Sequence, residues 1–198
     1  MKDRTKRTAE YERLTGETNI TATLTIEGNN DIAVSTGIGF LDHMLTALSF
    51  HAGFDLTLKC EGDLGVDDHH TAEDSALALG SVLDKALGSR QGIARFGFAY
   101  APLDDALVRA VVDISSRPWA AVNLTFQRDT IGTLATENIR HVLASLATAA
   151  RMNLHVDCIR GDNDHHLAEA AFKALALALR TAVEYRGSGE TPSTKGAL

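Results

Sequence analysis

Six of the eight histidines fall into two matching groups in which an acidic residue lies close by. The segments DHHTAE (68–73) and DHHLAE (164–169) both contain His-His-x-x-Glu. On a helix, residues three or four positions apart share a face, so each glutamate can approach the histidines before it. A further histidine also precedes each pair in the sequence, His43 before the first pair and His141 before the second. The pattern predicts two metal ions with three nitrogens and one carboxylate each, a set that suits first-row transition ions. The predicted ligands are His43, His69, His70, Glu73, His141, His165, His166 and Glu169.

A less specific interpretation of these histidines exists. A single histidine on an amphipathic helix is usually exposed to solvent or hydrogen-bonded, and a pair at a helix start can be ordinary exposed polar groups. Here the same histidines, glutamate and preceding aspartate recur at equivalent places, while the apolar residues around them differ. This recurrence favours metal binding. The spacing leaves open which ligands hold which ion.

Other candidate site residues lie outside the histidine groups. Glu17 precedes a predicted strand, and Arg95 and Arg117 lie near strand edges; each can equally be an exposed surface charge. The segment PSTKG (192–196) offers hydroxyls, a cation and a glycine, which suits a phosphate group. The alternative for this segment is a frayed terminus.

The elements that position these residues also recur. Residues 43–60 align with 141–158 without a gap, and after a two-residue deletion 68–74 aligns with 164–170. Such a register predicts a duplicated half-domain, with halves near 1–92 and 93–186 and a C-terminal tail over 187–198.

Hydrophobic periodicity predicts the elements within each half. Alternation predicts strands over 19–26, 54–60, 107–114, 120–126 and 152–159, and helical spacing predicts helices over 42–52 and 137–151. A further helix is expected to open at His69 and another at His165, with the preceding aspartate as N-cap. The residues from 186 onwards, rich in Gly, Ser and Thr, predict a loop. Strands and helices do not alternate regularly, so the predicted class is α+β, with two small sheets and helices packed on one face of each.

Composition excludes several other classes of protein. The 198 residues carry a net charge of −7, which disfavours nucleic acid and anionic membranes as partners. No apolar run approaches the ~20 residues of a membrane span, and no apolar stretch follows the basic first residues as in a secretory signal. The two cysteines fit a reducing compartment, so the expected location is the cytoplasm.

With these motifs assembled, the sequence resembles the imidazoleglycerol-phosphate dehydratase family of histidine biosynthesis. The resemblance is carried by GETNI (16–20), TGIGFLDHML (36–45), DDHHTAED (67–74), ARFG (94–97), VDISSRP (112–118), NLHV (153–156), GDNDHHLAEAAFKAL (161–175) and PSTKG (192–196). It implies a four-helix bundle between two four-stranded sheets. It also implies an assembly of twenty-four subunits with each active site at a subunit boundary.

The resemblance further implies roles for individual residues. The eight predicted ligands would hold two Mn²⁺ per active site. Glu17 and His51 would be the catalytic acid–base candidates. The residues implied to contact the substrate are Glu17, His43, His51, His69, Glu73, Arg95, Arg117, Ser193, Thr194 and Lys195.

The implied reaction removes water from imidazole glycerol phosphate to give imidazole acetol phosphate. Its route would pass through a dimetal-bound imidazolate and a diazafulvene, because the proton that is lost comes from an unactivated carbon. Two rival classes stay open at this point. A dinuclear metallohydrolase uses similar ligands, although such sites more often contain bridging carboxylates. A metal store or sensor needs the ligands but leaves Glu17, Arg95, Arg117 and the tail without a role.

Overall fold

The computed structural model describes residues 6–187 and 189–196. Over these ranges the helices are α1 (Gly39–Ala52), α2 (His69–Leu87), α3 (Thr136–Ala149) and α4 (Asp164–Ala182). The first-half strands are β1 (Thr8–Leu14), β2 (Thr18–Thr25), β3 (Ile32–Ser35) and β4 (Asp55–Gly62). The second-half strands are β5 (Phe96–Leu103), β6 (Ala106–Asp113), β7 (Trp119–Asn123) and β10 (Asn153–Arg160), with a short ribbon of β8 (Thr130–Ile131) and β9 (Leu134–Ala135).

The two four-stranded sheets in the described residues have the same topology. Their strand orders are β1-β2-β4-β3 and β5-β6-β10-β7. In each sheet an antiparallel hairpin pairs with a third strand, and the last strand joins that one in parallel. This correspondence confirms the predicted α+β class and the duplicated half-domain.

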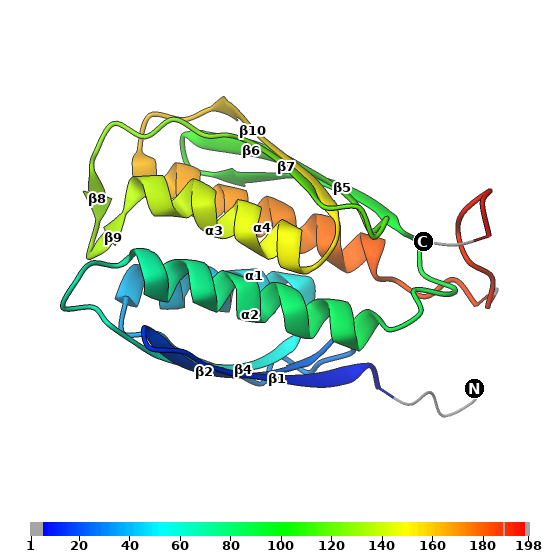
Figure 1. Ribbon diagram of the computed structural model, residues 1–198. Coiled ribbons are helices and arrows are strands. Elements are labelled where there is room, and N and C mark those ends of the chain that lie inside the picture. The colour runs from blue at the N-terminus through cyan, green and yellow to red at the C-terminus, as the bar shows by residue number, and fades with distance from the viewer. Residues whose placement is uncertain (1–5, 188, 197–198) are drawn as a thin grey trace.

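The helices form a layer between the two sheets (Figure 1). Helix α2 packs against α3, and α1 packs against α4, so each helix of one half lies against a helix of the other. One glycine permits the first of these contacts: a Cβ at Gly80 would lie 2.5 Å from the carbonyl oxygen of Leu146. The two halves therefore share one core.

Strand alternation explains which sheet faces are buried. In β2 the side chains of Ile20, Ala22 and Leu24 are buried, whereas the residues between them are more exposed. Leu56 and Leu58 of β4 point to the same side. Each apolar face covers the helices, so the helix layer is held on both sides.

Three predicted element ends differ clearly from the structure, the first two of them for a local reason. The strand predicted over 120–126 ends at Asn123, because the backbone N–H groups of Gln127 and Arg128 donate to the carboxylate of Asp164 instead. The helix predicted to reach Arg151 ends at Ala149, and Arg151 has a φ of 53°, which a right-handed helix does not accommodate. Helix α1 begins at Gly39, three residues earlier than predicted.

One of the two predicted aspartate N-caps is confirmed in its position, and the other is wrong. Asp68 occupies the N-cap position of α2, but its side chain makes no capping hydrogen bond; it accepts from the backbone N–H of Ala135 at 2.6 Å. Asp164 is the first residue of α4, and Asn163 is the cap, accepting from the N–H groups of His165 and His166.

The segment after α4 has neither helix nor extended strand in its described part, as predicted for a loop. An isolated bridge joins Tyr185 to Ile93. Within the predicted tail over 187–198, positions 188, 197 and 198 lie outside the described residues, as do positions 1–5 of the first half. None of the helices in the described ranges combines the length and the apolar character needed to cross a membrane.

Candidate metal centre and active site

The predicted ligands lie near the starts of the four helices, and six of them form two clusters. One cluster contains His43 from α1 with His165 and Glu169 from α4. The other contains His69 and Glu73 from α2 with His141 from α3. In each cluster, one ligand atom per residue lies within 4.8 Å of the others. Because α1 packs on α4 and α2 on α3, each cluster draws on both halves of the chain.

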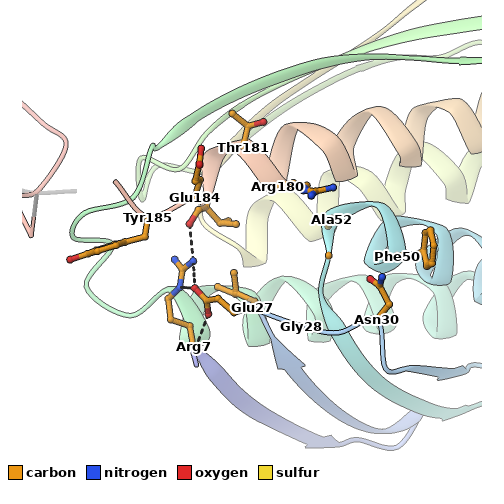
Figure 2. Close-up of a pocket in the computed structure, with 13 residues that line it drawn as sticks. Arg7, Glu27, Gly28, Asn30, Phe50, Ala52, Arg180, Thr181, Glu184 and Tyr185 are labelled. Carbon is orange, nitrogen blue, oxygen red and sulfur yellow. Dashed lines mark hydrogen bonds and ion pairs between the residues drawn. The ribbon is translucent and has the colours of Figure 1, made fainter. Parts of the chain in front are cut away.

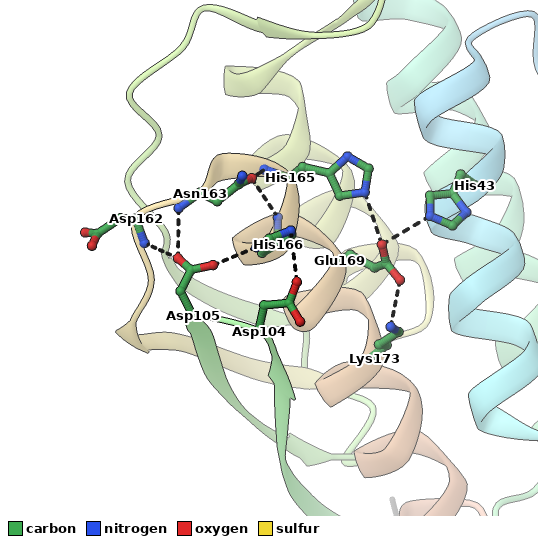
Figure 3. A network of polar contacts seen from close by, with 9 residues as sticks. All are labelled: His43, Asp104, Asp105, Asp162, Asn163, His165, His166, Glu169 and Lys173. Atoms are coloured by element: carbon green, nitrogen blue, oxygen red, sulfur yellow. Dashed lines mark hydrogen bonds and ion pairs between the residues drawn. The ribbon is translucent and has the colours of Figure 1, made fainter.

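Glu169 is the centre of the first cluster (Figure 3). Its Oε2 atom lies 3.2 Å from Nε2 of both His43 and His165, and its Oε1 atom lies 2.7 Å from Nζ of Lys173. Burial raises the pKa of the Glu169 carboxyl, but hydrogen bonds to Lys173 and His43 outweigh this and hold the pKa at about 2. Glu169 is therefore an anion that two imidazoles face.

Glu73 has the corresponding place in the second cluster. Its Oε1 atom lies 3.1 Å from Nε2 of His141, and its Oε2 atom lies 3.9 Å from Nε2 of His69. The two imidazole rings stack with centroids 4.9 Å apart. Nε2 of His141 is buried and makes no hydrogen bond. An unpaired buried nitrogen beside a carboxylate and a second imidazole fits a divalent transition ion.

The second histidine of each pair lies outside these clusters. Nδ1 of His70 is 3.0 Å from Asp63, and its Nε2 is 3.7 Å from Glu17. Nδ1 of His166 is 2.6 Å from Asp105. A single chain thus assembles three of the four ligands predicted for each ion, and the remaining histidine of each set lies beside surface carboxylates.

The two acid–base candidates differ in their distance from the clusters. Glu17, in the β1–β2 turn, is 55% exposed at its side chain and lies beside His70. His51 lies in the last turn of α1, eight residues and about 12 Å along the helix from His43. Burial lowers the pKa of His51, and the nearby charge of Lys173 adds to this. His51 is thus separate from the cluster that contains His43.

The candidate phosphate-binding residues lie near the opposite ends of the helices. Arg95 is not the free surface cation of the alternative interpretation: its side chain is 13% exposed and pairs with Asp113 at 2.7 Å. Its Nη1 atom also donates to the carbonyl oxygen of Pro192 at 2.9 Å, which ties the start of the PSTKG segment to β5. Arg117 is exposed. Ser193, Thr194 and Lys195 directly follow the anchored proline.

Two hollows in the described residues border these regions. One of about 660 Å³ lies where α1 and α4 end, away from the two histidine clusters, and Arg7 and Glu27 form a 2.7 Å ion pair in it (Figure 2). Another of about 340 Å³ is lined by Ile38, Leu64 and Asp68, directly before the first residue of α2. The smaller hollow therefore adjoins the cluster that contains His69.

Several residues at the site carry no recognisable sequence signal. Asp63, Asp105 and Asn138 each face Nδ1 of a predicted ligand histidine, but none lies at a helical spacing from it. Only folding brings Asp105, in the β5–β6 turn, next to His166 at the start of α4. Lys173 lies one turn after Glu169, so its i,i+4 spacing was a usable signal.

Fold and site together define a duplicated α+β protein with paired histidine–glutamate clusters at its helix starts. The family model described as imidazoleglycerol-phosphate dehydratase matches residues 36–179, which include every residue of both clusters. The chain therefore belongs to the imidazoleglycerol-phosphate dehydratase family.

Individual relatives agree with this membership. The imidazoleglycerol-phosphate dehydratase of Pyricularia oryzae is 64% identical over 169 residues, covering 84% of this chain and 75% of the relative. That of Phaffia rhodozyma is 55% identical over 197 residues, covering 97% and 96%. The crystal structure of IGPD from Pyrococcus furiosus in complex with (S)-C348 has a TM-score of 0.82 at 37% identity, covering 95% of this chain and all of that one. The family named from the sequence motifs is thus confirmed.

Proposed function

We propose that the protein removes water from imidazole glycerol phosphate to give imidazole acetol phosphate, using two Mn²⁺ per active site, in the cytoplasm. The observation that carries the proposal is the family match over 36–179, since it spans both histidine–glutamate clusters. The donor set of each cluster, two imidazoles and one carboxylate, is acceptable to Mn²⁺. Lewis-acid polarisation of the imidazole ring is the chemistry that the bound ions supply.

The active site that we propose is shared between copies of the chain. Helix α4 has 19 residues and is therefore about 28 Å long, with His165 in its first turn. At its other end, the carbonyl oxygen of Ala182 accepts from the backbone N–H of Arg95 at 2.9 Å. A ring and a phosphate joined by three carbons span roughly 6–8 Å at ~1.5 Å per single bond. One substrate molecule cannot reach both ends of one chain.

A second copy resolves this mismatch. If the cationic end of one subunit approaches the histidine end of another, Arg95, Arg117, Ser193, Thr194 and Lys195 can bind the phosphate while the clusters bind the ring. The same contact lets His70 and His166, which belong to neither cluster in the described part of their own chain, supply the third nitrogen of each set. We therefore infer a homo-oligomer, with twenty-four subunits as the size that the family resemblance suggests.

The remaining roles belong to carboxylates and cations of the chain. Glu17 is exposed and close to His70, so its carboxylate can accept a proton from the substrate and return it to a leaving hydroxyl. The phosphate-binding residues supply positioning, because a phosphate held far from the reacting bond fixes the orientation of the rest of the substrate. His51 is the second acid–base candidate.

Turnover with and without metal tests the proposal. Protein stripped with a chelator is given imidazole glycerol phosphate, and product is measured before and after Mn²⁺ is restored. We expect imidazole acetol phosphate only with Mn²⁺, and no inorganic phosphate. Release of phosphate would instead support a metallohydrolase. Binding of Mn²⁺ without any turnover would support a metal store.

A further inference from the structure

We propose that Asp105 and Asp63 are positioning residues that hold the imidazoles of His166 and His70 with the proton on Nδ1, leaving Nε2 free to bind a metal ion. The inference rests on the proposed function, because it assigns these nitrogens to the metal sites. An imidazole can ligate through one nitrogen only if that nitrogen carries no proton. The partner of the other nitrogen decides where the proton lies.

The contacts of Asp105 determine which ring nitrogen of His166 carries the proton (Figure 3). Its Oδ2 atom accepts from the backbone N–H groups of Asp162 at 2.7 Å and Asn163 at 3.0 Å, which fixes the carboxylate against the turn before α4. Its Oδ1 atom lies 2.6 Å from Nδ1 of His166. A carboxylate oxygen only accepts, so Nδ1 must be the donor. Nε2 is then the nitrogen available to a metal.

The first half reaches the same arrangement through a residue at a different place. Oδ2 of Asp63 lies 3.0 Å from Nδ1 of His70. Asp63 directly follows β4, whereas Asp105 belongs to the β5–β6 turn, so the two aspartates are not equivalent in the repeat. Two non-equivalent positions thus give the same contact at equivalent histidines. Inheritance from the duplicated ancestor does not explain this, but a shared requirement of the histidines does.

A histidine inside one of the clusters has the same arrangement, with an amide oxygen facing its Nδ1 atom. Oδ1 of Asn138 lies 2.9 Å from Nδ1 of His69, and the Asn138 side chain is buried. Nε2 of His69 is the atom that faces Glu73. Carboxylates and amides behind ligand histidines typically change metal affinity 10–100-fold when they are removed.

Replacing Asp105 by asparagine tests the proton position directly. In Asp105→Asn the amide oxygen can keep both backbone contacts, which turns the NH₂ group towards Nδ1 of His166. The NH₂ group donates, so Nδ1 must accept and the ring proton moves to Nε2. We expect Mn²⁺ affinity at one of the two sites to fall roughly 10–100-fold. The probe is Mn²⁺ alone, titrated into chelator-stripped protein, with free Mn²⁺ read from its electron paramagnetic resonance signal.

Asp104→Asn is the matched control. Oδ2 of Asp104 lies 3.5 Å from Nε2 of the same ring, and the substitution removes the same charge without touching Nδ1. Asparagine also tolerates the positive φ of 46° at this position. We expect a smaller loss of Mn²⁺ affinity than in Asp105→Asn, since the Asp104 side chain is 74% exposed and does not set the proton on Nδ1. Equal losses in both variants would mean that charge alone matters and would overturn the proposal.

The remaining outcomes are distinguishable from failure of the proposed function. Wild-type protein that binds no Mn²⁺ would overturn both the positioning role and the proposed function. Wild-type binding with unchanged affinity in Asp105→Asn would overturn the positioning role alone. Thermal unfolding checks that the variant is folded; if it is not, Asp63→Ala repeats the test at His70, because it removes the acceptor that faces Nδ1 of that ring. A loss of Mn²⁺ affinity in the Asp63 variant supports the proposal, and an affinity equal to that of wild type contradicts it.

Discussion

At the scale of single residues, the two clusters have the same ligands in different surroundings. His69 is hydrogen-bonded to Asn138, whereas His165 packs edge-on against the ring of Phe40 with centroids 5.1 Å apart. Glu169 is paired with Lys173, whereas Leu77 stands at the aligned position after Glu73. The duplication therefore preserved the ligands but not the groups around them, and the two metal sites are expected to be unequal.

The pairing of Lys173 with Glu169 predicts the order of metal binding. A lysine ammonium 2.7 Å from a ligand carboxylate competes with a cation for it, so the cluster with His43 should bind Mn²⁺ less tightly. We expect a titration to resolve two classes of site, roughly 10-fold apart, a gap of about 1.4 kcal/mol. Lys173→Leu, which copies the other half, should narrow the gap. Two indistinguishable sites in the wild type would contradict this prediction.

The exposed carboxylate of Glu17 carries the predicted proton transfer. Glu17→Gln keeps the size of the side chain but removes its basicity, so kcat should fall roughly 10²-fold or more while KM changes little. Metal content should stay at the wild-type value. Steady-state kinetics of the Mn²⁺-loaded variant measure this, with exposed Glu12→Gln of β1 as control. A kcat within about twofold of wild type would exclude Glu17 as the acid–base and leave His51 as the next candidate.

At the scale of elements, one buried arginine ties the two halves together. Arg90, in the segment between α2 and β5, is 3% exposed. Its guanidinium pairs with Asp84 of α2 and donates to the carbonyl oxygens of Ala150 and Arg151 at the end of α3, at 3.0 and 3.1 Å. The arginine thus joins the ends of two helices whose other ends carry the second cluster.

Loss of this arginine should destabilise the fold. Arg90→Ala leaves two carbonyls without their partner and leaves Asp84 with only the exposed Arg151, which costs about 3 kcal/mol or more of unfolding free energy. Arg151→Ala is a matched control, because Arg90 and Arg151 both have a positive φ and both approach Asp84. The side chain of Arg151 lies 3.8 Å from Asp84 but is 54% exposed, so its loss should cost about 1 kcal/mol or less of unfolding free energy. Thermal unfolding compares the two. Equal losses of unfolding free energy in the two variants would show that the buried contacts of Arg90 do not stabilise the fold, and would contradict this prediction.

The sequence predicted the four helices and five of the ten strands in the described residues, because burial on one face leaves a regular period. It did not predict β1, β3, β5, β8 and β9. It missed where the side chains of Asp68 and Asp164 form their hydrogen bonds, since the backbone N–H groups that donate to them, of Ala135 and Gln127, lie far along the chain. It also predicted the ligand residues but not their grouping. The grouping depends on α1 packing against α4 and α2 against α3, which no local pattern encodes.

At the scale of the whole molecule, the histidine ends and the cationic ends of the helices lie too far apart to act on one substrate within a chain. If a second copy completes each ligand set, as proposed, the ion binds fully only in the oligomer, and metal binding and assembly are then linked. We expect chelation to reduce the particle size measured by light scattering and to lower the melting temperature. Restored Mn²⁺ should reverse both changes. A monomer in buffer that contains Mn²⁺ would contradict the assembly.

The central claim is that metal ligands of one copy and phosphate-binding residues of another act on the same substrate molecule. Two variants test it most directly: Glu73→Ala, which lacks a cluster carboxylate, and Lys195→Ala, which lacks a cation of the tail and should mainly raise KM. Both are assayed at a substrate concentration well below the raised KM, where each alone forms little product. Each is assayed alone and after co-expression in one oligomer. The account predicts that the mixed oligomer regains imidazole acetol phosphate formation, up to about a quarter of wild type for random mixing of two kinds of subunit. A mixed oligomer no more active than the two variants apart would contradict it.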